Sequence, residues 1–174
     1  MASIRALFIT GTDTAVGKTH VSCYILRQLQ RQGILAGAYK PVCSGATVAP
    51  GARLEWDDVE RLHAAIDQRI PKDRITPQCF NAPLAPPIAA RVERRVVDRA
   101  LVDSGLDEVG ALANCVVIEG AGGWLCPLTD TESFADWAAA RGFPVLVVAR
   151  RGLGTINHTL LTIEAIRRRK PTVA

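Results

Sequence analysis

The stretch GTDTAVGKT, residues 11–19, follows directly on the apolar run ALFIT, residues 6–10. It ends in Gly-Lys-Thr, as phosphate-binding loops do, but five residues separate its two glycines where the usual pattern has four. A phosphate cradle needs a strand that ends abruptly, a glycine where the backbone approaches oxygen, a lysine and a hydroxyl. All four are present, since Lys18 can reach the outer phosphates and Thr19 can ligate magnesium. The stretch therefore predicts a phosphate cradle between a strand and a helix.

The backbone amides of this loop would point at anionic oxygen from the N-terminus of the following helix. Thr12 stands where a second glycine is usual, so the first turn is expected to be a variant. The alternative is an ordinary strand-to-helix turn capped by Asp13 or Thr14. The cradle is favoured because position, order and residue identity all fit it. The residues expected to contact nucleotide are Thr12, Asp13, Thr14, Ala15, Val16, Gly17, Lys18 and Thr19.

Short apolar runs alternate with segments of helical period along the rest of the chain. Strands are predicted at 4–10, 34–41 and 143–150, and residues 114–124 predict a buried strand that opens into a glycine turn. Helices are predicted at 18–32, 57–66, 133–142 and 156–169. Residues 44–56 are rich in Gly, Ala and Pro and predict a loop, and residues 81–105 predict one broken helix or two. Near-continuous apolar strands followed by helices are typical of an α/β fold, a parallel sheet with helices on both faces in three layers. No repeat or linker divides residues 1–174, which predicts a single domain.

The composition is that of an ordinary globular protein, with 48% hydrophobic and 22% charged residues. The five cysteines are scattered and form no Cys-x-x-Cys pair, so neither a disulfide framework nor a zinc site is indicated. A reducing, cytoplasmic location fits this pattern. No apolar segment of about 18 residues and no leader sequence is present, so no membrane partner is predicted.

The formal net charge of +4 raises nucleic acid as a partner. The basic runs are RVERR at 91–95 and RRRK at 167–170. The second run closes a helical pattern, where cations favour the negative end of the helix dipole. No aromatic residues are interleaved to stack on bases. The sequence therefore predicts no nucleic-acid partner.

A second group of polar residues lies in VVIEGAGGW, residues 116–124. Glu119 ends a buried strand, and in parallel sheets nucleotides bind at the carboxyl edge, beside the loop after the first strand. Its carboxylate is expected to hold magnesium directly or through water. Gly122 and its neighbouring glycines let the backbone approach a ligand. The alternative is a tight turn with an exposed glutamate.

Five segments together resemble the dethiobiotin synthase family, and they span nearly the whole chain in the order found there. They are GTDTAVGKT, YKPVCSG, IEGAGGW, SFADWA and LGTINHTLLTIEAIR. The five-residue spacing of the loop is that family's own form. The resemblance implies a P-loop NTPase-like fold and an ATP- and Mg²⁺-dependent ligase. Its substrates would be CO₂ and 7,8-diaminononanoate, joined with closure of a ureido ring and release of ADP and phosphate.

The implied reaction passes through a carbamate and then a carbamic-phosphoric anhydride, so negative charge gathers around the transferred group. Positioning and cationic electrostatics matter more than a strong base there. By similarity, Lys18 and Lys40 supply the cations, Ser44 lies over the carbamate, and Thr14 contacts it from the loop. Without the resemblance, Lys40 and Ser44 would be a solvated lysine and a loop residue.

The resemblance also implies a metal site formed by Thr19, Glu119 and an aspartate of WDDVERL. Asp58 fits the family spacing to the following leucine better than Asp57, and both remain open. Gly122 is expected to contact the nucleotide.

In the same family the segment like GLGTINH lies at a helix N-terminus and receives the substrate carboxylate across the interface of a homodimer. Free amides at a helix N-terminus form an anion site. For Asn157 the alternative is a helix cap. The residues expected to bind substrate are Ser44, Gly154, Thr155, Ile156 and Asn157.

Two departures from the family pattern stand out. Ala15 replaces the acidic residue of many members, and the sequence ends at PTVA, 171–174, where the next strand is expected to begin. The strand with the adenine-contacting asparagine and the final helical part would follow it. Two other classes fit the fold, a partitioning-type nucleotide switch ATPase and a non-catalytic truncated remnant. The switch class is usually marked by a second lysine early in the loop, where Thr12 and Asp13 stand here.

Overall fold

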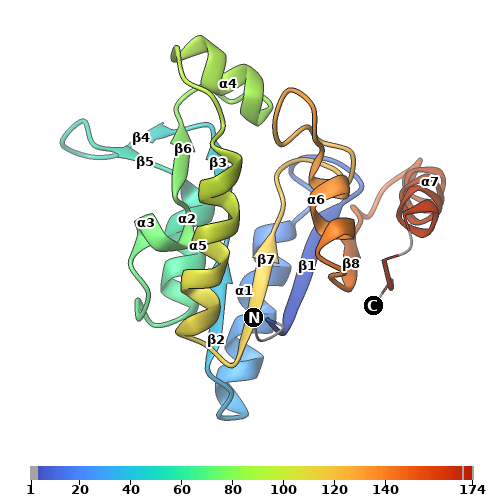
Figure 1. The fold of residues 1–174 in the computed structure, drawn as a ribbon, viewed down its shortest axis with the longest axis horizontal. Helices are drawn as coiled ribbons and strands as arrows, with labels where there is room; N and C mark the ends of the chain where they lie inside the picture. Colours follow the sequence, from blue (N-terminus) through green and yellow to red (C-terminus); the bar gives the residue numbers. More distant parts are fainter. Residues whose placement is uncertain (1–3, 170, 174) are drawn as a thin grey trace.

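The structure is a computed structural model that describes residues 4–169 and 171–173. Helices and strands alternate along much of the chain (Figure 1). In chain order they are β1 (Ala6–Gly11), α1 (Lys18–Arg31), β2 (Ala36–Tyr39), β3 (Val42–Ser44), β4 (Thr47–Val48), β5 (Leu54–Glu55), α2 (Asp57–Ala65), α3 (Lys72–Ile75), β6 (Gln78–Phe80), α4 (Pro86–Val92), α5 (Arg99–Ala111), β7 (Cys115–Glu119), α6 (Phe134–Ala140), β8 (Val145–Val148) and α7 (Thr155–Arg168).

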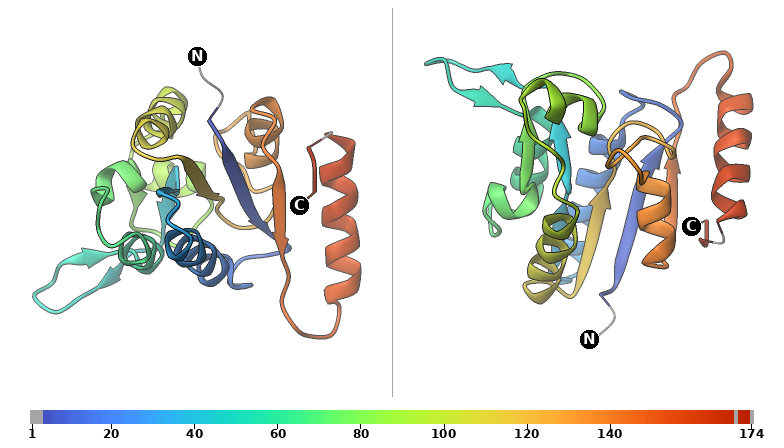
Figure 2. Two further views of the ribbon diagram at one scale, coloured as in Figure 1. Left: turned by 90° about the horizontal axis from the view of Figure 1, so that it is seen from below. Right: turned by 45° about the horizontal axis from the view of Figure 1, so that its top comes forward.

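The central sheet has parallel strands in the order β2-β7-β1-β8. Helix α1 covers one face, α5 and α6 cover the other, and α7 lies beside β8 (Figure 2). The predicted three-layer α/β fold is therefore confirmed. Val173 makes an isolated parallel bridge with Val145, the first residue of β8. Lys170, in the basic run 167–170, and Ala174, in the expected strand start 171–174, lie outside the described residues.

The segment between β2 and β7 differs from the prediction. Residues 44–56 are not all loop, because β4 and β5 pair as a short antiparallel hairpin. Helix α3 and strand β6 were not predicted, and β6 pairs with β3 in a separate parallel pair. Residues 81–105 hold two helices, α4 and α5. Arg94 adopts a positive φ of 55° between them, and the Asp98 carboxylate caps α5 by accepting from the Leu101 amide at 3.1 Å.

An aromatic core packs against the middle of β1. Phe8 is fully buried and packs edge-on against Trp124 and Trp137, each with its ring centre 6.1 Å away. Edge-to-face pairs of this kind stabilise beyond their buried area. A Cβ at Gly120 would lie 2.9 Å from the Phe8 ring, so only glycine fits there. The core thus fixes the start of the loop after β1 and the turn after β7 against each other.

No helix in the described part of the chain is long and apolar enough to cross a membrane. The five cysteines are all unpaired, and none lies in a disulfide.

Candidate active site

The loop between β1 and α1 is a variant turn. Gly17, which precedes α1, has a φ of 101°, and Ala15 has a φ of 57°, so two loop residues adopt the left-handed region. A Cβ at Gly11 would lie 2.7 Å from the Val16 side chain and 2.8 Å from the Asp13 carbonyl oxygen. The loop therefore closes tightly over Gly11, and it uses a left-handed alanine as well as the left-handed Gly17.

Lys18 folds back over this loop. Its Nζ donates to the Asp13 carbonyl oxygen at 3.0 Å, and the side chain is largely buried. Burial, and then the nearby charge of Lys40, lower the pKa of Lys18 below its ordinary value. The ammonium thus lies across the loop, at the N-terminus of α1, where an anion is favoured.

Sheet register brings Lys40 and Glu119 together. Tyr39 of β2 is paired with Ile118 of β7, and Glu119 with Ile9 of β1. Lys40 and Glu119 therefore leave the sheet side by side at its carboxyl edge, next to the loop. This edge is where ligands bind in open parallel sheets.

Lys40 joins two carboxylates. Its Nζ lies 2.7 Å from Glu119 Oε1 and 2.9 Å from Asp58 Oδ2. Burial alone would lower the pKa of Lys40, but the two carboxylates reverse this, and the pKa is raised above its ordinary value. Burial would raise the pKa of Asp58, but Lys40 and a hydrogen bond from Thr19 lower it below its ordinary value. Lys40 and Asp58 are therefore both charged at neutral pH.

The oxygen atoms around Thr19 fit a magnesium ion. Thr19 Oγ1 lies 2.6 Å from Asp58 Oδ1 and 3.0 Å from Glu119 Oε1, yet one hydroxyl proton can serve only one of these acceptors. Glu119 Oε2 is buried and has no partner among the described residues. The site therefore has more oxygen acceptors than hydrogen atoms to satisfy them. Magnesium binds oxygen ligands, and it is commonly held by one or two carboxylates together with substrate phosphates. The donor set therefore fits the ion.

Helix α2 determines which aspartate joins this cluster. Asp58 turns toward Thr19 and Lys40, and its side chain is 37% exposed. Asp57, one residue earlier, is 71% exposed, does not line the cavity described below, and pairs with Arg61 at 3.4 Å. The geometry therefore favours Asp58 over Asp57 as a metal ligand.

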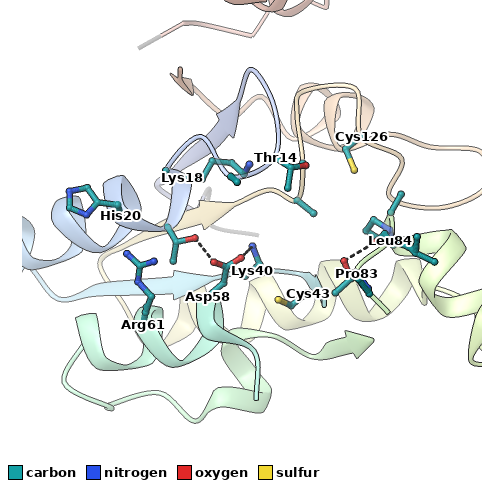
Figure 3. Close-up of a pocket in the computed structure, with 18 residues that line it drawn as sticks. Thr14, Lys18, His20, Lys40, Cys43, Asp58, Arg61, Pro83, Leu84 and Cys126 are labelled. Atoms are coloured by element: carbon teal, nitrogen blue, oxygen red, sulfur yellow. Dashed lines mark hydrogen bonds and ion pairs between the residues drawn. The ribbon is translucent and has the colours of Figure 1, made fainter. Parts of the chain in front are cut away.

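A cavity of about 540 Å³ opens over the cluster (Figure 3). The predicted site residues that line it are Thr14, Ala15, Gly17, Lys18, Thr19, Lys40, Ser44, Asp58 and Gly122. Thr12, Asp13 and Val16 are not in its lining, and Glu119 lies beneath it, bonded to Lys40 and Thr19. The structure thus gathers most of the predicted residues from four separate segments around one space.

The far wall of the cavity is formed by the turn before α4. Ser44 Oγ donates to the Leu84 carbonyl oxygen at 2.7 Å, which ties β3 to this wall. Several lining residues were not predicted: His20, Cys43, Arg61, Pro83, Leu84, Ala85, Pro86, Ala121 and Cys126. His20 directly follows the loop motif and Arg61 lies one helical turn after Asp58, but neither spacing by itself indicates a side chain that faces the cavity.

The predicted substrate residues 154–157 do not line this cavity. They begin α7, where Gly154 has a φ of 87° and Ile156 is 74% exposed. The Thr155 hydroxyl is buried without a partner in the described part of the chain. Within one chain, therefore, this helix N-terminus and the cavity remain separate.

Comparison with known proteins finds one family profile and several relatives that match nearly the whole chain. The profile of a family described as an AAA domain matches residues 5–174. The ATP-dependent dethiobiotin synthetase BioD of Anaeromyxobacter sp. strain Fw109-5 is 51% identical over 166 residues, 95% of this chain and 72% of its own length. BioD 1 of Escherichia coli O157:H7 is 38% identical over 170 residues, 98% of this chain and 75% of its own length.

Among solved structures, the kinase domain of the Escherichia coli tyrosine kinase ETK is similar to 99% of this chain and 66% of that chain. The TM-score is 0.51 at 17% identity, a likeness of fold alone.

The fold and the loop define an ATP-binding α/β protein of the P-loop class. Within that class, the chain belongs to the ATP-dependent dethiobiotin synthetase family. It is an ATP-dependent ligase of biotin biosynthesis.

Proposed function

We propose that this chain joins CO₂ to 7,8-diaminononanoate at the expense of ATP and closes the ureido ring of dethiobiotin. One substrate amine adds to CO₂, loses a proton and becomes a carbamate. A carbamate oxygen attacks the terminal phosphorus of ATP, and ADP leaves. The second amine then attacks the carbonyl carbon and loses a proton, and phosphate leaves with the bridging oxygen. The observation that supports this proposal most is the cluster in which Lys40 and Asp58 line the cavity and the buried Glu119 lies beneath them.

The two lysines have separate roles in this proposal. Lys18, at the N-terminus of α1, binds the outer phosphates in place of its present bond to the Asp13 carbonyl. Lys40 stays charged because of its carboxylate partners, and it stabilises the negative charge that gathers between carbamate and phosphate. Ser44 and Thr14 line the same cavity and orient the carbamate through their hydroxyl groups. None of these residues needs to act as a strong base.

Thr19, Asp58 and Glu119 would hold the magnesium ion. When bound, the ion neutralises part of the charge on the nucleotide phosphates. The chain's own part is to converge three oxygen-bearing side chains and to keep Asp58 ionised through Lys40 and the Thr19 hydroxyl.

A second copy of the chain would complete the site. The amides at the start of α7 suit the substrate carboxylate, as does the Thr155 hydroxyl, which has no partner among the described residues. Both lie outside the cavity of their own chain. Ile156, Leu160 and Leu161 are each more than half exposed on α7, as expected for a face that a second copy covers. A homodimer would therefore supply residues 154–157 of one chain to the cavity of the other.

Product formation across a dilution series tests this proposal. Purified chain should form dethiobiotin only when diaminononanoate, bicarbonate and ATP are all present, because each supplies atoms or energy to the ring closure. The rate per chain should fall on dilution together with the dimer population measured by sedimentation. ATP consumption without dethiobiotin would contradict the function, and a monomer that works at full rate would contradict the shared site.

A further inference from the structure

The charged side chains already described at this site balance one another. Lys18 and Lys40 carry two positive formal charges, and Asp58 and Glu119 carry two negative ones. Lys40 in particular forms ion pairs with both carboxylates. A nucleoside triphosphate brings several negative charges, of which a magnesium ion offsets only a part. A further cation facing the cavity would therefore stabilise the bound nucleotide by offsetting part of its remaining negative charge.

Arg61 is such a cation. It lines the cavity from α2, three residues after Asp58, so the two side chains lie on neighbouring positions of the helix surface. Figure 3 shows its guanidinium directed from α2 toward α1, on the side of Asp58 away from Lys40. The Cys23 thiol donates to the Arg61 backbone carbonyl at 3.4 Å, a contact that ties α1 to this turn of α2.

The Arg61 guanidinium is otherwise weakly engaged. Within the described residues its one acceptor is Asp57 Oδ2 at 3.4 Å, the long end of hydrogen-bonding distance, and both side chains are well exposed. Exposed ion pairs of this kind contribute little to stability. The other donors of the planar guanidinium remain free to bind an anion, and its fork suits phosphate oxygens.

We propose that Arg61 binds the phosphate chain of the nucleotide at a phosphate other than the one transferred. The position carries this assignment, since Arg61 and Lys40 lie on opposite sides of Asp58 in Figure 3, and the proposed function assigns Lys40 to the carbamate. The inference rests on the proposed nucleotide site at the loop. It makes Arg61 a nucleotide-binding residue whose contact is present with ATP and with ADP alike.

The variant Arg61→Gln tests the proposal by calorimetric binding in the presence of Mg²⁺. ATP, ADP and inorganic tripolyphosphate should each bind about tenfold or more weakly, because one charge-assisted phosphate contact is lost. The turnover number at saturating ATP should change less than about twofold, while the KM for ATP rises by the binding factor. Unchanged ADP affinity, or a loss confined to ATP, would overturn the assignment. A loss for ATP and ADP but not for tripolyphosphate would overturn it in favour of a nucleoside contact.

Matched variants separate this role from others. Arg27→Gln makes the same charge change on α1 outside the cavity and should leave all three affinities unchanged. An equal loss of affinity in Arg27→Gln would show that the effect of Arg61→Gln comes from the change in net charge and not from a direct phosphate contact. Asp57→Asn frees Arg61 from its partner and should not weaken binding, whereas a loss equal to that of Arg61→Gln would assign the effect to the helix pair. If Lys18→Ala leaves ATP affinity intact, the proposed nucleotide site itself fails. If Lys18→Ala abolishes binding and Arg61→Gln does not alter it, only the Arg61 assignment fails.

Discussion

Replacing Lys18 with alanine is expected to lower turnover by about a thousandfold while the protein stays folded. A fixed cation aimed at developing phosphate charge contributes on this scale when it is removed from a site that excludes water. The cost to folding should be small. The bond that is lost runs to the carbonyl of Asp13, an exposed residue that water can reach in the variant. Thermal unfolding and ATP binding measured on the same preparation separate the two effects.

Lys72→Ala is the matched control. Lys72 also pairs with an acidic residue, Glu60, but it does not line the cavity. Its variant should keep full turnover and normal ATP affinity. If Lys18→Ala retains more than about a tenth of the activity, the loop does not hold the transferred phosphate and the site assignment is wrong.

The sequence was sufficient to predict the central sheet, because four apolar runs were long enough to show their period and each was followed, after a turn or a loop, by a predicted helix. The loop motif and the strand-end Glu119 were predictable for the same reason, since both follow directly on such strands. The short elements β4, β5, β6 and α3, of two to four residues, carry no readable period and form through contacts with the rest of the fold.

The choice between Asp57 and Asp58 could not be made from one sequence. Adjacent helix residues point about 100° apart, so the answer depends on how α2 is rotated against α1, which is a property of packing. Arg61 and His20 belong to no phosphate-loop pattern and become visible as cavity residues only once α1 and α2 are placed side by side. Side-chain roles that depend on two helices meeting are therefore the part of the site that sequence periodicity misses.

Replacing Lys40 with methionine is expected to abolish turnover and also to destabilise the fold by on the order of 3 kcal/mol in the absence of magnesium. The variant leaves Asp58 and the buried Glu119 facing each other without the cation that now joins them. The estimate lies at the lower end of the range for a broken buried pair because water reaches Asp58. Millimolar magnesium should restore part of the lost stability by binding between the carboxylates.

The double variant Lys40→Met/Glu119→Gln separates charge from packing. Removing the second charge should recover most of the stability lost in Lys40→Met, and magnesium should no longer stabilise the protein appreciably. The cycle consists of the parent, Lys40→Met, Glu119→Gln and the double variant. Denaturant unfolding of these four proteins, with and without magnesium, gives the coupling free energy between Lys40 and Glu119. A Lys40→Met protein that is as stable as the parent and insensitive to magnesium would contradict the assigned cluster.

Oxygen transfer from CO₂ to phosphate tests most directly that this chain couples ATP to ring closure through a carbamic-phosphoric anhydride. The reaction is started with freshly prepared C¹⁸O₂, diaminononanoate and ATP, and the products are analysed by mass spectrometry before the label exchanges with water. The expected result is one ¹⁸O in the released phosphate and one in the ureido carbonyl of dethiobiotin for each turnover. Labelled dethiobiotin formed beside phosphate that carries no ¹⁸O would contradict the mechanism.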